Sequence, residues 1–311
     1  MSKIAIIDCG TNTFHLLIVS LANKAFNVLH QEKQVVKIGE GGINNKLITD
    51  AAQGRAIEAL KKFQAKIDNY QVSEIFAFAT SAFRNAENGQ KLRDQIRHVT
   101  RIQLNIIDGL QEAELIYRGV QSAIALGNDP VLVMDIGGGS VEFIIGNGKQ
   151  IVWKQSFEVG AQRLMDLFHK HDPISDTEII RLEEHLKKVL ATLFSAVAKH
   201  KPFTLIGSSG TFDTLSEIYC LAQNIEIEDG QTETPLSISA YHDIHRNLVS
   251  KERGARLAIP GMIEMRVDMI VVASCMVSLI LKATTIGNLR VSRYALKEGV
   301  LARIVEGERL I

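Results

Sequence analysis

Two stretches of the chain share one pattern of apolar and polar positions. In each, four apolar residues lead into an aspartate, a turn of small residues follows, and a second apolar run begins. The stretches cover residues 4–19 and 131–145 and align without a gap. A single apolar–Asp–x–Gly motif is weak, but two copies in register predict a duplicated domain that begins each time with a β-hairpin. The matched pairs are Asp8 with Asp135, Gly10 with Gly137, Thr13 with Ser140, and His15 with Glu142.

The segments after the two hairpins predict the same order of elements. After the first hairpin we expect strands at residues 28–38, 74–79 and 103–107 and helices at 50–69, 86–99 and 111–126. After the second we expect strands at 150–157, 203–206 and 289–292, a helix from Ser175, a helix over 273–281 and a closing helix.

Local capping signals support two of these helices. Thr49 precedes the first helix as an N-cap, and Ser175 with Glu178 reads as a capping box. Strands alternating with helices predict an α/β fold with mixed sheets covered on both faces. We place one domain at residues 1–125 together with a C-terminal helix at about 294–311, and the second at 126–293.

Composition and charge exclude several classes of protein. Of 311 residues, 46% are apolar and 23% are charged, which is typical of a globular protein and not of a disordered one. Lys plus Arg and Asp plus Glu are 35 each, so the net charge of zero argues against a general nucleic-acid binder. Three scattered cysteines predict neither disulfides nor a metal knuckle and suit a cytoplasmic protein. The longest uncharged run, residues 269–281, is too short for a membrane span and predicts a buried helix.

Each hairpin turn consists of residues that let backbone N–H groups approach an anion. A pair of tight turns without a ligand is the alternative, but two matched turns favour phosphate binding. The candidate phosphate-binding residues are Gly10, Thr11, Asn12 and Thr13 in the first turn and Gly137, Gly138, Gly139 and Ser140 in the second.

The acidic residues around the turns are candidate metal ligands. Asp8 and Asp135 each end an apolar strand, where a carboxylate is costly unless it is paired or coordinated. Asp135 and Glu142 could bracket Mg²⁺, which prefers oxygen ligands. For Asp8, a metal role and simple capping of the turn are about equally favoured.

Three further segments carry candidate residues. Residues 207–211 follow a strand and open a helix, so Gly210 and Thr211 form either a third anion site or an ordinary β–α turn. Ser81 and Arg84 follow another strand, where the arginine reaches a phosphate or only caps the previous element. Glu112 begins a helix and could deprotonate a water, although spacing alone favours a role in complementing the helix dipole.

Taken together these segments resemble the exopolyphosphatase and guanosine pentaphosphate phosphatase (Ppx/GppA) family, which belongs to the fold superfamily of actin, sugar kinases and Hsp70. The resemblance implies two ribonuclease-H-like domains, each a mixed five-stranded sheet flanked by helices, with a cleft between them. It covers nearly the whole chain and rests on residues 8–15 (DCGTNTFH), 79–84 (ATSAFR), 109–113 (GLQEA), 135–142 (DIGGGSVE), 207–211 (GSSGT), 260–261 (PG), 266–268 (RVD) and 296–299 (LKEG).

The resemblance also implies roles for individual residues. Glu112 matches the family's catalytic base, and Asp135 and Glu142 match its Mg²⁺ ligands. The family often has a second glutamate where this chain has Gln111, which removes one negative charge beside Glu112. Longer members carry additional helical domains associated with long-chain grip and dimer contacts. We therefore expect short polyphosphate chains as substrate, and a homodimer stays an open expectation.

The sequence thus predicts a Mg²⁺-dependent exopolyphosphatase that releases orthophosphate from inorganic polyphosphate. The alternative within the same class is hydrolysis of guanosine pentaphosphate or another nucleotide, with residues 207–211 against the nucleoside. The alternative from another class is a module that senses a nucleotide or polyphosphate with little turnover, because this superfamily also includes kinases, chaperones and filament formers. We expect neither nucleic acid nor a membrane as a partner.

Overall fold

The computed structural model describes residues 2–22 and 25–308, which form two compact units. Unit 1 comprises Met1–Gly119 with Leu296–Ile311, and unit 2 comprises Val120–Ala295. The first division lies after Gly119, inside a helix, whereas the sequence had suggested residue 125. Each unit is described below by itself.

Unit 1 is built on a five-stranded mixed sheet in the order β3-β2-β1-β4-β5. β1 pairs with β2 and β2 with β3 in antiparallel fashion, and β1 pairs with β4 and β4 with β5 in parallel. The strands are β1 (Ser2–Cys9), β2 (Thr13–Ala22), β3 (Ala25–Val35), β4 (Glu74–Ala79) and β5 (Leu104–Ile106).

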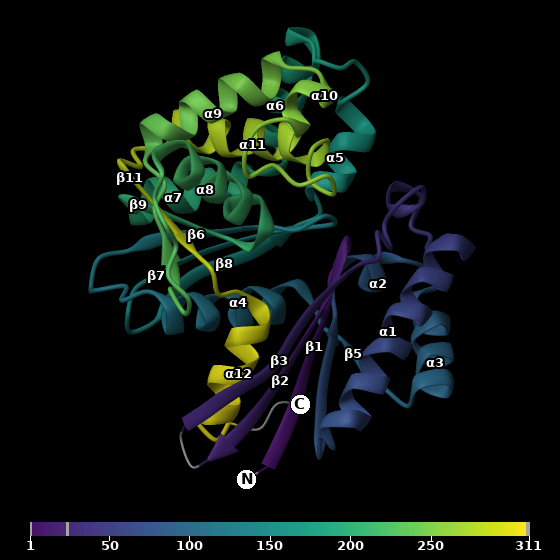
Figure 1. Cartoon of the computed structure of the whole chain (residues 1–311). Coiled ribbons are helices and arrows are strands. Elements are labelled where there is room, and N and C mark those ends of the chain that lie inside the picture. Colours follow the sequence, from purple (N-terminus) through teal and green to yellow (C-terminus); the bar gives the residue numbers. More distant parts are fainter. Residues whose placement is uncertain (1, 23–24, 309–311) are drawn as a thin grey trace. The chain divides into compact units, whose positions relative to one another are not determined.

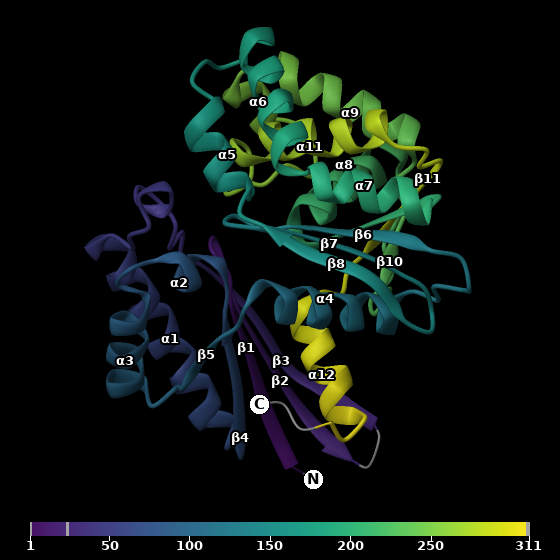
Figure 2. The ribbon, with the colours of Figure 1, turned by 180° about the vertical axis from the view of Figure 1, so that it is seen from behind.

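Helices flank this sheet. α1 and α3 lie side by side on one side of it and α12 lies on the other, as both views show (Figures 1 and 2). The side-chain hydroxyl of Thr49 caps α1 as expected, accepting a hydrogen bond from the Ala52 amide. The helices are η1 (Ile43–Asn45), α1 (Asp50–Tyr70), α2 (Ser81–Asn85), α3 (Gly89–Thr100), α4 (Gly109–Ala123) and α12 (Leu296–Val305).

Unit 2 is built on a six-stranded sheet in the order β10-β11-β9-β6-β7-β8. The expectation of five strands was wrong here, because the two residues of β10 add to the edge of β11. Every residue of β6 and β7 is buried, which accounts for their continuous apolar runs. The strands are β6 (Val131–Ile136), β7 (Val141–Gly146), β8 (Ile151–Phe157), β9 (Thr204–Ser208), β10 (Glu233–Thr234) and β11 (Asn288–Ser292).

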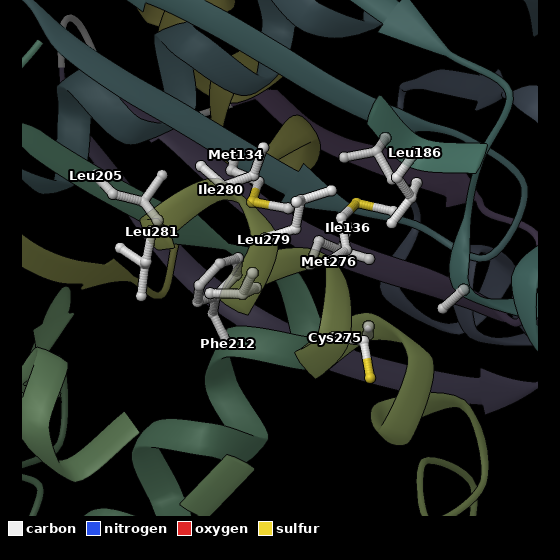
Figure 3. Close-up of a cluster of buried hydrophobic side chains, with 14 of the residues drawn as sticks. Met134, Ile136, Leu186, Leu205, Phe212, Cys275, Met276, Leu279, Ile280 and Leu281 are labelled. Carbon is white, nitrogen blue, oxygen red and sulfur yellow. The ribbon is translucent and has the colours of Figure 1, made fainter. Parts of the chain in front are cut away.

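The core of unit 2 surrounds α11 (Met269–Ala283), whose residues from Met269 to Leu281 are all buried. α11 packs against α5, α6 and α9, and Figure 3 shows its side chains beside Met134 of β6 and Phe212 of α8. This confirms the predicted buried helix. The other helices are α5 (Ala161–Phe168), α6 (Asp176–Val189), α7 (Ala191–His200), α8 (Ser209–Gln223), α9 (Ile238–Ser250) and α10 (Arg253–Leu257).

The two sheets share one topology, as the internal repeat predicts. β8-β7-β6-β9-β11 repeats β3-β2-β1-β4-β5 in order and in strand direction. In the first hairpin Asp8 lies opposite His15, and in the second Asp135 lies opposite Glu142, so the sequence alignment also gave the correct register. Within the described part of the chain, no helix is both long enough and apolar enough to span a membrane.

Candidate active site

The first glycine turn (residues 10–13) joins β1 to β2 in unit 1. The Gly10 amide donates to the Thr13 carbonyl oxygen at 3.1 Å, and a Cβ on Gly10 would lie only 3.2 Å from the same oxygen. The following loop holds the turn from one side, since the Val36 and Lys37 amides both donate to the Asn12 carbonyl at 2.9 Å. A planar trans peptide points its C=O and N–H in opposite directions. The Thr13 amide, which shares a peptide with the Asn12 carbonyl, is therefore turned away from that loop.

The second glycine turn (residues 137–140) joins β6 to β7 in unit 2. It repeats the same closing hydrogen bond, from the Gly137 amide to the Ser140 carbonyl at 3.1 Å. The start of α5 holds it, because the Gly160, Ala161 and Gln162 amides donate to the three glycine carbonyls at 2.9–3.2 Å. These bonds use donors that the first turn of a helix otherwise leaves unsatisfied.

With its carbonyls bound to α5, the second glycine turn has its amides facing the opposite way. None of the amides of Gly138, Gly139 and Ser140 donates a hydrogen bond to another group within residues 2–22 and 25–308. Successive amides with this orientation form a concave donor set that suits a phosphate oxygen. The anion site at this turn stays a prediction, and the orientation of the three amides is its geometric basis.

Two residues, Gly160 and Arg163, make the close packing of α5 on the second glycine turn feasible. Gly160 is required, because a Cβ there would lie 2.3 Å from the carbonyl carbon of Gly138. Arg163 is buried and donates from Nε to the Gly139 carbonyl at 2.8 Å and from Nη2 to Glu158 at 3.2 Å. The sequence analysis named neither residue, and α5 itself was not predicted.

Asp135 lies near the end of β6 and is only 5% exposed. Its Oδ2 accepts hydrogen bonds from the hydroxyls of Ser208 at 2.7 Å and Ser209 at 2.6 Å. Burial raises the pKa of Asp135 above its ordinary value, while the two hydroxyls and the nearby Arg266 oppose that rise. The two serines were quoted in the sequence only as part of a turn, and the structure assigns them to this carboxylate.

Glu142 is directly opposite Asp135 in the hairpin and is 1% exposed. Its Oε1 accepts from the Ser156 hydroxyl of β8 at 2.6 Å. Directly opposite residues of an antiparallel pair present their side chains on the same face, close together. Two buried carboxylates that share a face repel each other, and a cation relieves that repulsion.

This pair fits the donor chemistry of Mg²⁺, because both groups offer carboxylate oxygens. Within the described ranges, no group of three or more His, Cys, Asp or Glu side chains is arranged to hold a metal ion. The pair therefore suits an ion that keeps waters and substrate oxygens in its shell and not a closed protein cage. Asp8, the third predicted ligand, is half-buried and faces His15 instead of a second carboxylate.

The third candidate loop, residues 207–211, runs from β9 into α8. Gly210 lies against a side chain, since a Cβ on it would come within 1.8 Å of Nη2 of Arg266. Burial lowers the pKa of Arg266, whereas Asp213 and Asp135 raise it, and its Nε is buried without a hydrogen-bond partner. Thr211 is buried as well. The loop is thus packed beneath an arginine that the sequence analysis did not select.

In unit 1 the structure joins Arg84 to Glu112. Nη1 of Arg84 donates to Oε2 of Glu112 at 2.8 Å and to the Ile107 carbonyl at 3.1 Å. Glu112 is buried, and a guanidinium at this distance stabilises a charged carboxylate. An ionised carboxylate is the form that accepts a proton from water. Glu112 therefore does more than complement a helix dipole, and Arg84, predicted to bind phosphate, holds this carboxylate.

Gln111 takes part in the hydrogen bonds that cap the start of α4. Asp108 Oδ1 accepts from the amides of Leu110 and Gln111 at 2.8 Å, and Oε1 of Gln111 accepts from the Asp108 amide at 3.1 Å. This is a reciprocal capping box in which glutamine serves as well as glutamate. The amide of Gln111 thus fixes the first turn of the helix that carries Glu112. Ser81, by contrast, lies in α2 and accepts a hydrogen bond from Asn85.

Within each unit the structure brings some of the predicted residues together. In unit 2 they are the second glycine turn, Asp135 and Glu142, and in unit 1 they are Arg84 and Glu112. Ser208, Ser209, Arg163 and Arg266 complete the set in unit 2. The local sequence signal for the serines was the Ser-Ser pair after an apolar strand. Arg266 began the quoted segment 266–268 but was given no role, and nothing in the local pattern marked Arg163.

Comparisons with known proteins identify the family of the chain. A sequence profile of the Ppx/GppA phosphatase family matches residues 17–308. A bifunctional 3-dehydroquinate synthase/phosphatase of Fusobacterium nucleatum is 32% identical over 267 residues, which are 82% of this chain and 38% of that protein. The chain thus spans well under half of that longer relative.

Solved structures of an exopolyphosphatase and of a Ppx/GppA family member are similar to this chain. An exopolyphosphatase from Cytophaga hutchinsonii is 45% identical and superposes with a TM-score of 0.96 over 99% of both chains. A Ppx/GppA family member from Aquifex aeolicus is 24% identical, with a TM-score of 0.81 over 100% of this chain and 99% of its own, and shares the fold. The chain therefore belongs to the Ppx/GppA phosphatase family.

Proposed function

We propose that this phosphatase is an exopolyphosphatase, which hydrolyses the terminal phosphoanhydride bond of short inorganic polyphosphate chains and releases orthophosphate. The observation that carries the proposal is the set of outward amides at Gly138, Gly139 and Ser140 beside the buried pair Asp135 and Glu142. A polyanion matches the amides, and a divalent cation matches the carboxylates. The 45% identity to an exopolyphosphatase supports the same substrate class.

The residues of unit 2 bind and orient the substrate in this proposal. The three amides hold oxygens of the terminal phosphates, and the α5 packing keeps those amides in place without reorganisation. Asp135 and Glu142 hold Mg²⁺, which when bound neutralises negative charge that develops on the phosphoryl oxygens. A net protein charge of zero means that this local donor set, and not a global field, attracts the polyanion.

The residues of unit 1 supply the base. Glu112 accepts a proton from the attacking water while the water oxygen bonds to the terminal phosphorus. The bridging P–O bond breaks, so the products are orthophosphate and a chain shorter by one phosphate. Arg84 holds the Glu112 carboxylate in the acceptor form and in one orientation until substrate arrives.

The second candidate substrate is guanosine pentaphosphate, whose 5′ end carries the same anhydride bond. The observation that favours guanosine pentaphosphate is the position of Arg266 against Gly210. A guanidinium plane stacks on a nucleobase as well as it binds a phosphate. The two substrates are separated by measuring kcat/KM for each in the same buffer. Polyphosphate chains of defined length in the same assay give the length preference.

The test of the mechanism is Glu112→Gln. We expect phosphate release to fall by about 10²–10⁴-fold, because a general base contributes on that order, while the substrate still binds. Glu58→Gln, at an exposed carboxylate of α1 that pairs with Lys61, is the matched control and should retain full activity. A wild-type protein that releases no phosphate from either substrate, or a fully active Glu112→Gln variant, would falsify the proposal.

A further inference from the structure

A pocket of about 380 Å³ opens in unit 1 beside β5, the edge strand of the five-stranded sheet. It is distinct from both glycine turns, none of whose residues line it. Its walls come from α3, β5, the start of α4 and α12. Its volume lies within the range of roughly 300–1,000 Å³ that small-molecule sites occupy.

Three arginines converge on this pocket. Arg93 and Arg97 are four residues apart on α3 and so share one helix face, and Arg303 comes from α12. Two of the arginines form ion pairs: Nη2 of Arg93 lies 2.8 Å from Oδ1 of Asp94, and Nε of Arg303 lies 2.6 Å from Oε2 of Glu308. Arg97 makes no ion pair with any residue in the described ranges, so its guanidinium is available to an anion.

The rest of the lining is partly polar and partly apolar. Side-chain amides of Gln90, Gln103 and Asn105 supply uncharged donors and acceptors. The apolar lining residues are Phe78, Leu104, Ile106, Ile107 and Leu115. The lining carboxylates are Asp94 and Glu114, so guanidinium groups exceed them by one. Such a lining suits a small organic molecule that carries an oxyanion and a polar body.

The pocket is connected to the helix that carries the proposed base. Gln111 and Glu114, on either side of Glu112 in the sequence of α4, both line it. Ile107 also lines it, and the carbonyl of Ile107 accepts the hydrogen bond from Arg84 that accompanies the Arg84–Glu112 ion pair. A molecule in the pocket therefore contacts the residues that position Glu112.

We propose that this pocket is an effector site for a small organic oxyanion, which Arg97 binds and which alters hydrolysis through α4. The binding claim stands on the pocket alone, and the effect on hydrolysis rests on the function proposed above. The oxyanion is a phosphate monoester or a carboxylate, since a guanidinium fork matches both. AMP and citrate serve as probes for the two. AMP has no phosphoanhydride bond and so is not hydrolysed by the proposed activity.

Binding is tested by titration calorimetry of the full chain with AMP and with citrate. We expect at least one probe to bind and Arg97→Ala to weaken that probe roughly tenfold or more, because a charge-assisted pair is lost. Lys91→Ala is the matched control, since Lys91 is an exposed cation of the same helix outside the pocket lining. The identity of the probe that binds distinguishes the two sources. If neither probe binds, or if Arg97→Ala binds as the wild type does, the site is overturned.

The effect on hydrolysis is tested with the same variants. We expect the bound probe to change the wild-type rate of phosphate release, and Arg97→Ala to keep the basal rate but lose this response. A probe that binds at Arg97 without changing the rate overturns the link to α4. A wild type that hydrolyses neither substrate overturns the proposed function instead, and calorimetry still decides whether the pocket binds an oxyanion.

Discussion

The two glycine turns have the same backbone and different surroundings. Each closes with an amide-to-carbonyl bond of 3.1 Å, and each places an acidic residue opposite a polar one across the hairpin. Around the first turn the carbonyls are held by an irregular loop, and the half-buried Asp8 faces His15. Around the second they are held by the start of α5, and the buried Asp135 faces Glu142.

This difference indicates that the duplicated hairpin is a scaffold and that its chemistry lies in the residues added around it. Both turns close with the same hydrogen bond, but only the second brings two buried carboxylates together. We therefore infer that the second turn holds the metal and that the first only assists in binding phosphate. The same substitution made in both hairpins should then have unequal effects.

The largest difference is expected between Asp135→Asn and Asp8→Asn. Loss of a metal ligand at Asp135 should lower phosphate release by on the order of 10²–10³-fold, the size typical of one electrostatic contributor. Asp8→Asn should cost less than about tenfold, because Asp8 is less buried than Asp135 and faces His15 instead of a second carboxylate. The measurement is kcat/KM over a series of Mg²⁺ concentrations, with a chelator-treated wild type for reference. Equal losses in the two variants would contradict the assignment of the metal to the second hairpin.

A backbone version of the comparison uses Gly160→Ala against Gly10→Ala. The first places a methyl group 2.3 Å from the Gly138 backbone, whereas the second places one 3.2 Å from the Thr13 carbonyl. Gly160→Ala should displace the second turn, reduce activity about 10²-fold and destabilise the fold by about 1–3 kcal/mol. Gly10→Ala should have the smaller effect on both. Activity and urea unfolding of the two variants check this order, and a fully active Gly160→Ala would show that the α5 packing does not position the amides.

The side chains that brace the turns give a third pair, Arg163→Ala and Arg55→Ala. Arg163 bonds directly to the Gly139 carbonyl, whereas Arg55 bonds to the carbonyls of Val36 and Lys37, one step away from the first turn. A lost hydrogen bond from a charged group is worth about 1.5–3 kcal/mol, so we expect Arg163→Ala to lower kcat/KM roughly tenfold or more. Arg55→Ala should have a smaller effect.

Separating kcat from KM distinguishes positioning from simple loss of stability in this pair. A misplaced donor set should raise KM for a phosphate substrate in the folded Arg163→Ala protein, and Arg163→Lys, which lacks the planar fork, should recover little. If Arg163→Ala only lowers the melting temperature and its kinetics stay unchanged, the arginine is structural.

The hairpins were predictable from sequence because their determinants are local. The length of a hairpin turn fixes the register of its strands, so Asp135 opposite Glu142 followed directly from the alignment. The capping box of Ser175 with Glu178 was predictable for the same reason, as its bonds span three residues. α2, with five residues, is too short for a helical period to show, and β10 exists only through its pairing with β11.

The contacts that complete the site were not predictable, because they join distant segments. Ser208 reaches Asp135 across 73 residues, and only the parallel register of β6 with β9 sets these two side by side. Arg84 of α2 and Glu112 of α4 form their ion pair although they are 28 residues apart in the sequence. A single sequence carries no signal for such pairs, so the roles of these residues had to be read from the fold.

The smallest expected effect concerns the pKa of Asp135, whose carboxylate accepts hydrogen bonds from the Ser208 and Ser209 hydroxyls. Burial raises this pKa and the Ser208 and Ser209 hydroxyls hold it down, so Ser208→Ala should raise it further. Asp135 must be ionised to bind a cation, and it takes up a proton as the pH falls through its pKa. A higher pKa therefore moves the acidic limb of the kcat/KM profile to higher pH, with a few-fold loss on that limb and none well above it. Ser195→Ala, at an exposed serine of α7 whose hydroxyl donates to the Ala191 carbonyl, is the control. A limb that stays in place or moves to lower pH in Ser208→Ala would separate activity from the ionisation of Asp135 and so remove the carboxylate from the proposed metal site.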